Sequence, residues 1–428
     1  MTGQRHPILF PLLFAALLGA ITLILGEVAL RTFLERALGR PPADAERSAE
    51  HQFWQRDDSL GWSNIPNASG RFTNGAFDGQ VHFDEFGNRM NAPRGTRVAG
   101  YRNIFFLGDS TTASLEVDDD ETVPALLEQA LRRRGQRVNV INLGVRGYGT
   151  DQSARKALML SRSLPPDEIV YMYVENDSWD NNVLREPGRK YGKGIYLRRE
   201  GEPLFASYRD PVPEDPEDFL GIVVFDQACR PALHTGTWKR DPRPHETPRR
   251  WLDDHLYLAR ALGRVRHALE DPDPSSIDPD RMIREQGIAW SDDFFLAYSD
   301  SGIVGRRCAS YFDAQMRFLL DRLRRIPGLR RLSVVHYPDW AVAKNLREGL
   351  PSPRVDNFRL LVREGLLDGY LDLTELYLRE RIRPGDVQCP YDEHFCERGP
   401  NGSPRTSCTG SSRRNEAWGA DPLAHGRG

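Results

Sequence analysis

From residue 103 onward, short runs of β-branched and aromatic residues alternate with longer segments whose apolar residues recur at helical spacing. Continuous apolar runs separated by amphipathic helices are typical of a parallel sheet with helices on both faces. The pattern therefore predicts an α/β fold with three layers, α/β/α. The expected strands are 103–107, 138–142, 169–174, 332–336 and 370–373, and the expected helices are 122–134, 151–162 and 308–325.

The segments outside this alternation divide the chain into parts of different character. Short aromatic runs before residue 100 are separated by turn residues such as Gly70 and Gly87, which is typical of hairpins. The last segment is rich in Gly, Ser, Arg and Pro and has no apolar period. We expect an N-terminal anchor at 1–40, a connector and β-rich lead-in at 41–100, the α/β domain at 101–399, and a disordered or aberrant tail at 400–428.

An insertion of about 185–305 interrupts the α/β alternation. It contains proline-rich acidic turns and one amphipathic helix, expected at 251–269. Insertions of this length are usually functional or ordered in their own right. We expect this one to cover the edge of the sheet where a substrate would lie.

The first apolar segment, Ile8–Leu25, has 18 residues without a charged side chain. A helix rising about 1.5 Å per residue would nearly span a hydrocarbon core of about 30 Å, so we expect an uncleaved membrane anchor. A cleaved signal peptide would need small residues close behind, whereas the nearest Ala-x-Ala is Ala43–Ala45. A buried core helix fits poorly, because the segment is apolar all round. The flanking positive charges, Arg5 before and Arg31, Arg36 and Arg40 after, slightly favour a cytoplasmic body.

Composition and charge narrow the classes of protein. The 428 residues are 39% hydrophobic and 28% charged, which argues against a polytopic membrane protein, a collagen-like chain or wholesale disorder. Lys and Arg number 58 against 61 Asp and Glu, and no long basic run occurs, so we expect no nucleic-acid partner. Five Cys without a C-x-x-C pair are too few for a disulfide scaffold, and we expect neither a metal nor a cofactor.

Three of the expected strands end in loops whose groups suit acyl transfer. Gly108–Ser110 follows the first strand, at the sheet edge where α/β folds place ligands, and a base would make Ser110 a nucleophile. The glycine-rich loop 142–152 follows the second strand and can direct backbone N–H groups at an oxyanion. Asn176 follows the third and can donate its side-chain amide. Singly, each motif has a plainer interpretation: a capping serine, a dinucleotide-type glycine loop of the wrong spacing, or a turn asparagine.

The chain has ten histidines, any of which could in principle act as the base for Ser110. His394 lies in an acidic stretch two positions after Asp392, which could orient its ring and stabilise the imidazolium. His336, at the end of an expected strand, is the competing base. Cys389 and Cys396 flank His394 and would close a short loop in an oxidising compartment. A zinc site made from the same residues has a spacing that fits no common pattern.

Together, these motifs resemble the SGNH/GDSL hydrolase superfamily. Gly108–Ser110 resembles the first block, Gly147 falls on the glycine of the second, Asn176 on the asparagine of the third, and Asp392 with His394 on the last. The resemblance implies a flavodoxin-like sheet with Ser110 as nucleophile, His394 as general base and Asp392 as its orienter. It also implies an oxyanion hole made by the backbone N–H groups of Ser110 and Gly147 and the side chain of Asn176.

The resemblance covers roughly 100–180 and 330–399. The lead-in segment Phe83–Arg89 also resembles membrane-anchored bacterial members, whose bodies lie outside the cytoplasm, and this implication opposes the charge count. Family members usually continue after the histidine block with an amphipathic helix, which 400–428 cannot supply. A shifted reading frame or truncation after Gly399, or a genuine divergent tail, would explain the difference.

We expect a serine esterase that forms an acyl-enzyme and cleaves a small-molecule or glycan ester, with carbohydrate O-acetyl groups as the first substrate hypothesis. One alternative is an O-acyltransferase that passes the acyl group to a glycan of the cell surface. The other is a non-catalytic, anchored glycan-binding protein on a decayed hydrolase fold. Retention of all five site residues argues against this last alternative.

Overall fold

The computed structural model describes residues 9–38, 52–73, 78–185, 191–198, 205–208, 219–237, 298, 300, 302–337 and 353–381. At its centre is a five-stranded sheet with strand order β14-β13-β7-β5-β6, and every neighbouring pair is parallel. The strands are β5 (Arg102–Leu107), β6 (Val138–Asn142), β7 (Glu168–Tyr173), β13 (Arg331–His336) and β14 (Gly369–Asp372). The predicted parallel sheet is thus confirmed, with strand ends within one residue of those expected from the sequence.

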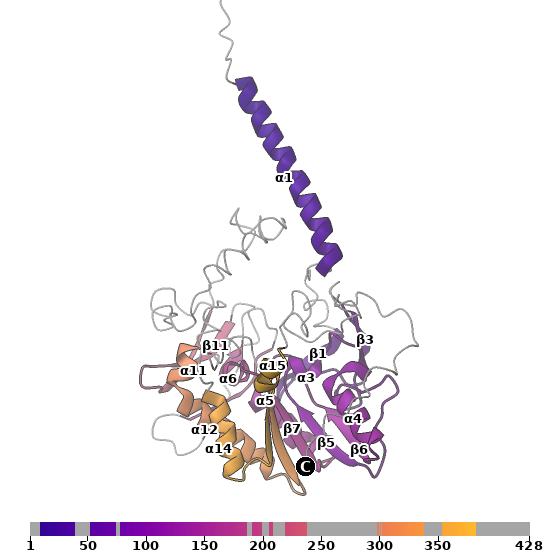
Figure 1. Cartoon of the computed structure of the whole chain (residues 1–428). Helices are drawn as coiled ribbons and strands as arrows, with labels where there is room; N and C mark the ends of the chain where they lie inside the picture. Colours follow the sequence, from indigo (N-terminus) through magenta and orange to yellow (C-terminus); the bar gives the residue numbers. More distant parts are fainter. Residues whose placement is uncertain are drawn as a thin grey trace, which may run out of the picture.

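Helices lie on both faces of the sheet, so the domain has three layers (Figure 1). One face packs against side chains of α5, α12 and α14, and the other against side chains of α4 and α15. The sequence pattern predicted α4, α5 and α12 but neither α14 nor α15. The bounds are α4 (Val123–Arg133), α5 (Thr150–Leu160), α12 (Ala309–Arg324), α14 (Pro353–Arg363) and α15 (Leu373–Arg379), with short helices α3 (Ser110–Ala113), η1 (Asp119–Glu121) and α6 (Asp177–Asp180).

Ahead of the central sheet, the chain forms two antiparallel hairpins. They are formed by β1 (Trp54–Asp57) with β2 (Gly61–Asn64), and by β3 (Ser69–Thr73) with β4 (Asp78–His82). Phe53, Phe72 and Phe83 from this region share a buried cluster with Ala113 and Leu115. The lead-in is therefore packed directly against the chain that follows β5.

Within the insertion, the structure describes a second core built on antiparallel strands. β8 (Val183–Arg185), β11 (Phe219–Phe225) and β12 (Pro231–Thr237) form one sheet, and β9 (Ile195–Leu197) pairs with β10 (Ala206–Tyr208). A disulfide joins Cys229 to Cys308, between α11 (Ile303–Arg307) and α12. The predicted helix 251–269 and the suggested pair Cys389–Cys396 lie outside the described residues.

The N-terminal segment forms the helix α1 (Leu9–Leu38), drawn in indigo in Figure 1. Its exposed apolar side chains include Leu17, Leu23 and Leu25. Within the part of the chain whose side chains are described, no helix is long and apolar enough to cross a membrane. The membrane anchor therefore stays a prediction.

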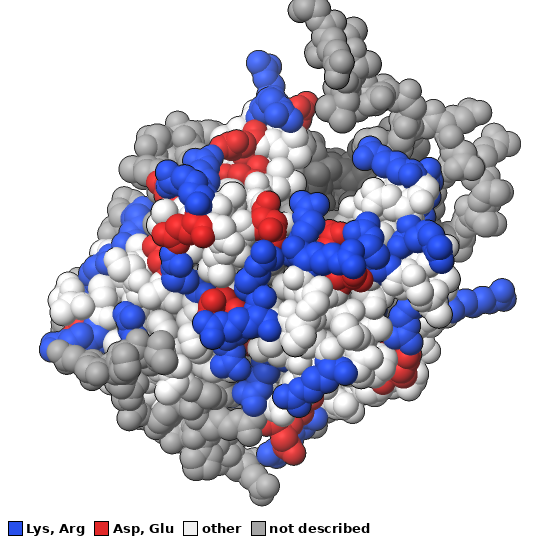
Figure 2. Space-filling model, turned by 90° about the horizontal axis from the view of Figure 1, so that it is seen from below, with Lys and Arg blue, Asp and Glu red and all other residues white. Residues whose placement is uncertain are grey.

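The surface seen from below carries many Lys and Arg side chains, with Asp and Glu among them (Figure 2). Ion pairs tie together the amino-terminal ends of the central strands: Arg102 Nη1 lies 2.5 Å from Glu168 Oε1, and Arg330 Nε lies 3.7 Å from Asp167 Oδ1. Pairs this exposed contribute little to folding free energy, at most about 1 kcal/mol each. The groups that suit acyl chemistry lie at the opposite, carboxyl-terminal ends of the strands.

Candidate active site

Ser110 lies where the chain leaves β5 and turns into α3. Gly108 makes this turn with φ +156°, and a Cβ there would come within 2.1 Å of Thr112 Oγ1 and 3.0 Å of the Met172 carbonyl. Asp109 caps the helix by accepting a hydrogen bond from Thr111 N at 2.9 Å. The glycine and the cap therefore hold Ser110, which is half-buried, at the carboxyl-terminal edge of the sheet.

Asn176 reaches the same turn from the adjacent strand β7. Its Nδ2 atom lies 3.3 Å from Asp109 Oδ2 and 2.8 Å from Asp180 Oδ2. The Ser110 hydroxyl also donates to Asp109 Oδ2, over 3.4 Å. The structure thus brings two of the predicted site residues together around the carboxylate of Asp109.

Gly147 lies in the loop between β6 and α5, with φ +71°. Trp62 Nε1 donates to the neighbouring Arg146 carbonyl at 3.0 Å, and the Tyr148 hydroxyl donates to the carbonyl of Trp62. Both contacts join the loop to the lead-in hairpin β1–β2. Among the hydrogen bonds of the described residues, none joins Gly147 to Ser110 or Asn176, so its part in an oxyanion hole stays a prediction.

The glycine loop is held tightly against α3. Asn142 Nδ2 donates to the Thr112 carbonyl at 2.9 Å, and a Cβ on Gly144 would come within 2.3 Å of Ala113 N. Only glycine fits such a close approach without moving the backbone. The second and first motif loops therefore form one packed unit.

The expected general base and its orienter, His394 and Asp392, lie outside the described residues. The competing base His336 is fully buried at the end of β13, with Nδ1 3.1 Å from the Tyr370 hydroxyl. Burial lowers the pKa of His336 to about 4, so the ring is neutral and weakly basic at neutral pH. No hydrogen bond or ion pair of the described chain connects it to Ser110, and these observations argue against it as the base.

Sequence reasoning missed the acidic residues that surround Ser110 and Asn176. Besides Asp109 and Asp180, the buried Asp177 accepts hydrogen bonds from the Tyr171 hydroxyl at 2.6 Å and from Val174 N at 2.9 Å. Burial raises the pKa of Asp177 well above its ordinary value, and the nearby charge of Asp109 adds to the rise. The motifs Gly-Asp-Ser and Asn-Asp were visible in the sequence, but their location beside each other in the fold was not.

Within the parts of the chain that the structure describes, no group of three or more His, Cys, Asp or Glu side chains is placed to hold a metal ion. The groups that do converge are a hydroxyl, a side-chain amide and carboxylates. A hydroxyl and an amide donor at one sheet edge are the elements of nucleophilic attack on a carbonyl with stabilisation of the resulting oxyanion.

No family model and no curated protein matches the chain. Among solved structures, it is similar to AlinE4, an SGNH-hydrolase family esterase, at 32% identity with a TM-score of 0.16, over 18% of this chain and 41% of that one. Two substituted variants of esterase AlinE4 match at 30% and 31% identity with TM-scores of 0.18, over 20% of this chain and 46% of theirs. The chain thus spans less than half the length of these structures, and the likeness is local.

Proposed function

We propose that the chain is a serine esterase of the SGNH type. The observation that carries the proposal is the meeting of Ser110 and Asn176, from the ends of adjacent parallel strands, at the carboxylate of Asp109. The Ser110 hydroxyl is held there by a contact of 3.4 Å, long for an O–H···O hydrogen bond. It is therefore oriented without being strongly engaged, as attack on an incoming carbonyl requires.

In this mechanism, Ser110 Oγ bonds to the ester carbonyl carbon while its proton passes to a base, for which we propose His394 oriented by Asp392. The oxyanion accepts hydrogen bonds from the backbone N–H groups of Ser110 and Gly147 and from the side chain of Asn176. The longer of the two Asn176 contacts, to Asp109 at 3.3 Å, is the one to be exchanged for the oxyanion. Collapse of this intermediate expels the alcohol with the proton from the base, and water then hydrolyses the acyl-enzyme.

For the substrate class we propose carbohydrate O-acetyl esters, presented to a body held outside the cytoplasm by α1. The disulfide between Cys229 and Cys308 supports the extracytoplasmic placement, since disulfides persist mainly in oxidising compartments. Alkylation and mass analysis of the protein from cells, with and without reduction, tests the placement: free Cys229 and Cys308 thiols would contradict it.

The direct test of the reaction is labelling of the full-length chain with a fluorophosphonate probe. Wild type should be labelled and Ser110→Ala should not, whereas Asn176→Ala should be labelled about 10²–10³-fold more slowly because an oxyanion donor is lost. Ser161→Ala, at the end of α5, is the matched serine control and should behave as wild type. Equal labelling of Ser110→Ala and wild type would refute the proposal. A separate assay with an ester substrate and an added sugar tests the alternative: transfer of the acyl group to the sugar in preference to water would identify an acyltransferase.

A further inference from the structure

The segment Phe83–Arg89 is a sequence motif of the lead-in that the proposed reaction does not use. Asp84 Oδ1 accepts hydrogen bonds from Phe86 N at 2.9 Å and Asn88 N at 2.8 Å, which closes a tight turn. The next residue, Arg89, then forms a bridge with Asn142, its N–H donating to the Asn142 carbonyl at 3.1 Å. The motif is therefore a turn that delivers one arginine to the end of β6.

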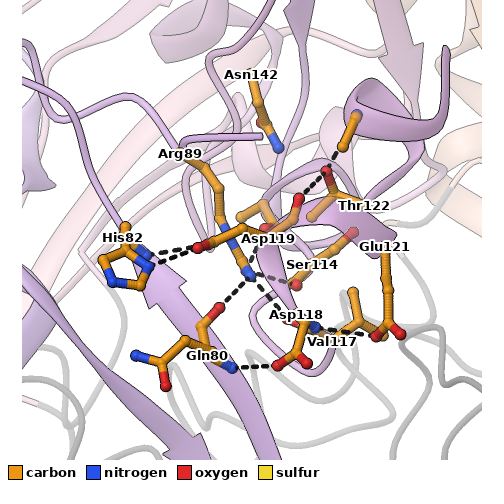
Figure 3. A network of polar contacts seen from close by, with 12 residues as sticks. Gln80, His82, Arg89, Ser114, Val117, Asp118, Asp119, Glu121, Thr122 and Asn142 are labelled. Atoms are coloured by element: carbon orange, nitrogen blue, oxygen red, sulfur yellow. Dashed lines mark hydrogen bonds and ion pairs between the residues drawn. The ribbon is translucent and has the colours of Figure 1, made fainter. Parts of the chain in front are cut away.

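The side chain of Arg89 is buried completely and uses every N–H donor that a guanidinium has (Figure 3). One donor meets a carboxylate and the other four meet backbone carbonyls. The contacts are Nε to Asp119 Oδ1 at 3.3 Å, Nη1 to the carbonyls of Ala113 at 3.0 Å and Ser114 at 2.6 Å, and Nη2 to those of Gln80 at 3.2 Å and Val117 at 2.7 Å.

Two of these carbonyls belong to the end of α3, the helix that begins with Ser110. With four residues, α3 has a single turn, closed by Ala113 N to Asp109 O at 2.9 Å and Ser114 N to Ser110 O at 2.8 Å. One turn is not stable by itself, because nucleation fixes several dihedral angles for very few hydrogen bonds. Its last carbonyls have no partner within the helix, and Ser114 has φ +45°, which is costly for a residue other than glycine.

We propose that Arg89 is a positioning residue for the nucleophile: it fixes the carbonyl end of α3 and through that turn sets the place of Ser110. This inference rests on the proposed function of Ser110. The connection is short, because only Thr111 and Thr112 lie between Ser110 and Ala113, the first of the two residues of this turn whose carbonyls Arg89 binds. A loss of those contacts would free the Ser114 backbone to relax and carry Ser110 with it.

The buried charge of Arg89 is compensated by the carboxylate of Asp119. Asp119 Oδ1 lies against Nε of Arg89, and Asp119 Oδ2 lies 2.5 Å from Nδ1 of His82, on β4. Burial raises the pKa of Asp119, while the charge of Arg89 opposes the rise. A lysine would carry the same charge but has at most three donors and lacks the planar fork, so it would not hold the four carbonyls together.

The Ser110 turn is held from two sides, by the glycine loop and by the lead-in that includes Arg89. From the glycine loop, Asn142 binds the Thr112 carbonyl and Arg146 is ion-paired with the buried Glu116. From the lead-in, Phe83 packs in the same apolar cluster as Ala113. The Ser110 turn is thus clamped between the glycine loop and the lead-in, and Arg89 supplies the polar part of the lead-in clamp.

The decisive variant is Arg89→Lys in the full-length chain. With fluorophosphonate at increasing concentration, we expect the maximal labelling rate of Ser110 to fall about 10²-fold, because misplacement by about 1 Å has that effect, while the half-saturating concentration stays unchanged. Arg71→Lys is the matched control, since Arg71 also lies in the lead-in but forms an exposed pair with Asp78. A labelling rate for Arg89→Lys equal to that of Arg71→Lys would overturn the proposal.

Amide hydrogen exchange gives a readout that does not depend on catalysis. In Arg89→Lys we expect faster exchange in 109–118 and unchanged exchange in 309–336. If wild type is not labelled, the esterase proposal fails, yet exchange still decides whether Arg89 holds this turn: unchanged protection in 109–118 overturns the inference. Should Arg89→Lys not fold, Asp84→Ala loosens only the turn that delivers Arg89 and should produce a smaller change of the same kind in 109–118. Faster exchange confined to 83–90 would then contradict the proposal.

Discussion

Two buried arginines near the central sheet hold their surroundings in different ways. Arg89, beside β6, donates to four backbone carbonyls and one carboxylate. Arg354, on α14, is equally buried but ion-pairs with two carboxylates and donates to a single carbonyl among its contacts in the described chain: its Nε lies 3.1 Å from Asp300 Oδ1, its Nη1 contacts Asp313, and its Nη2 lies 3.3 Å from the Ala309 carbonyl.

The two sets of contacts have different consequences: those of Arg89 position the backbone, and those of Arg354 hold separate elements together. Backbone carbonyls have a fixed direction, so a guanidinium bound to four of them determines the path of the chain. Carboxylates on separate elements are joined chiefly by charge, and the buried Asp300 also accepts a hydrogen bond from the Tyr173 hydroxyl of β7. We therefore expect loss of Arg89 to affect Ser110 most strongly, and loss of Arg354 to affect the free energy of unfolding most strongly.

The largest stability effect is expected for Arg354→Met. This change leaves Asp300 and Asp313 without their cation, and removing one partner of a buried ion pair typically costs about 3–5 kcal/mol. Burial raises the pKa of Asp300, and the charge of Arg354 opposes this rise, so loss of Arg354 would make the charged carboxylate costlier to bury. Denaturant unfolding would measure the loss, and Arg354→Lys should lose markedly less because a cation remains.

Arg359→Met is the control on the same helix, because Arg359 is half-exposed and pairs with the exposed Glu375. It should change the free energy of unfolding by at most about 1 kcal/mol. If Arg354→Met were no more destabilising than Arg359→Met, the two-carboxylate site would not hold α14 to the domain, and the comparison of the arginines would collapse.

The next effect is a pH dependence that arises from His336, at the end of β13. The folded pKa of His336 is lowered by burial to about 4, against 6.5 for a free histidine, so the unfolded chain takes up the proton first. The stabilisation is complete above about pH 6.5 and is lost as pH falls towards 4, by about 3 kcal/mol in all. Unfolding free energies measured across this range should show the loss in wild type and a reduced slope in His336→Asn.

His234→Asn provides the matched control, since His234 is an exposed residue of β12. Its slope between pH 4 and 6.5 should equal that of wild type. Equal slopes for His336→Asn and wild type would mean that another group accounts for the acid sensitivity.

The smallest effect is expected for Arg71→Ala in the lead-in. Arg71 and Asp78 form an exposed pair, with 52% and 29% of their side chains accessible, and such pairs contribute at most about 1 kcal/mol. Denaturant unfolding of Arg71→Ala therefore sets the baseline for an exposed arginine of the lead-in. If Arg71→Ala lowered the free energy of unfolding by several kcal/mol, the β3–β4 hairpin and not Arg89 would be the main source of stability in the lead-in.

The sequence alone determined the order of the central elements and three of the loops at the sheet edge. Buried parallel strands leave a local signature, a short β-branched run between helices, and this signature located β5, β6 and β7 and placed Ser110 and Asn176 after their strands. The helix α14 was missed because its buried residues include Arg354 and Asn357, which interrupt the apolar pattern of its face.

Only the tertiary structure decided which partners the polar residues have. Four such pairings depend on segments far apart in the chain: Asp109 joins Ser110 to Asn176, Arg89 reaches α3, Cys229 pairs with Cys308, and the His336 ring contacts the Tyr370 hydroxyl. The physical reason is one of range. Hydrophobic periodicity is a property of neighbouring residues, whereas a buried donor is satisfied by whichever acceptor the packed backbone brings within about 3 Å.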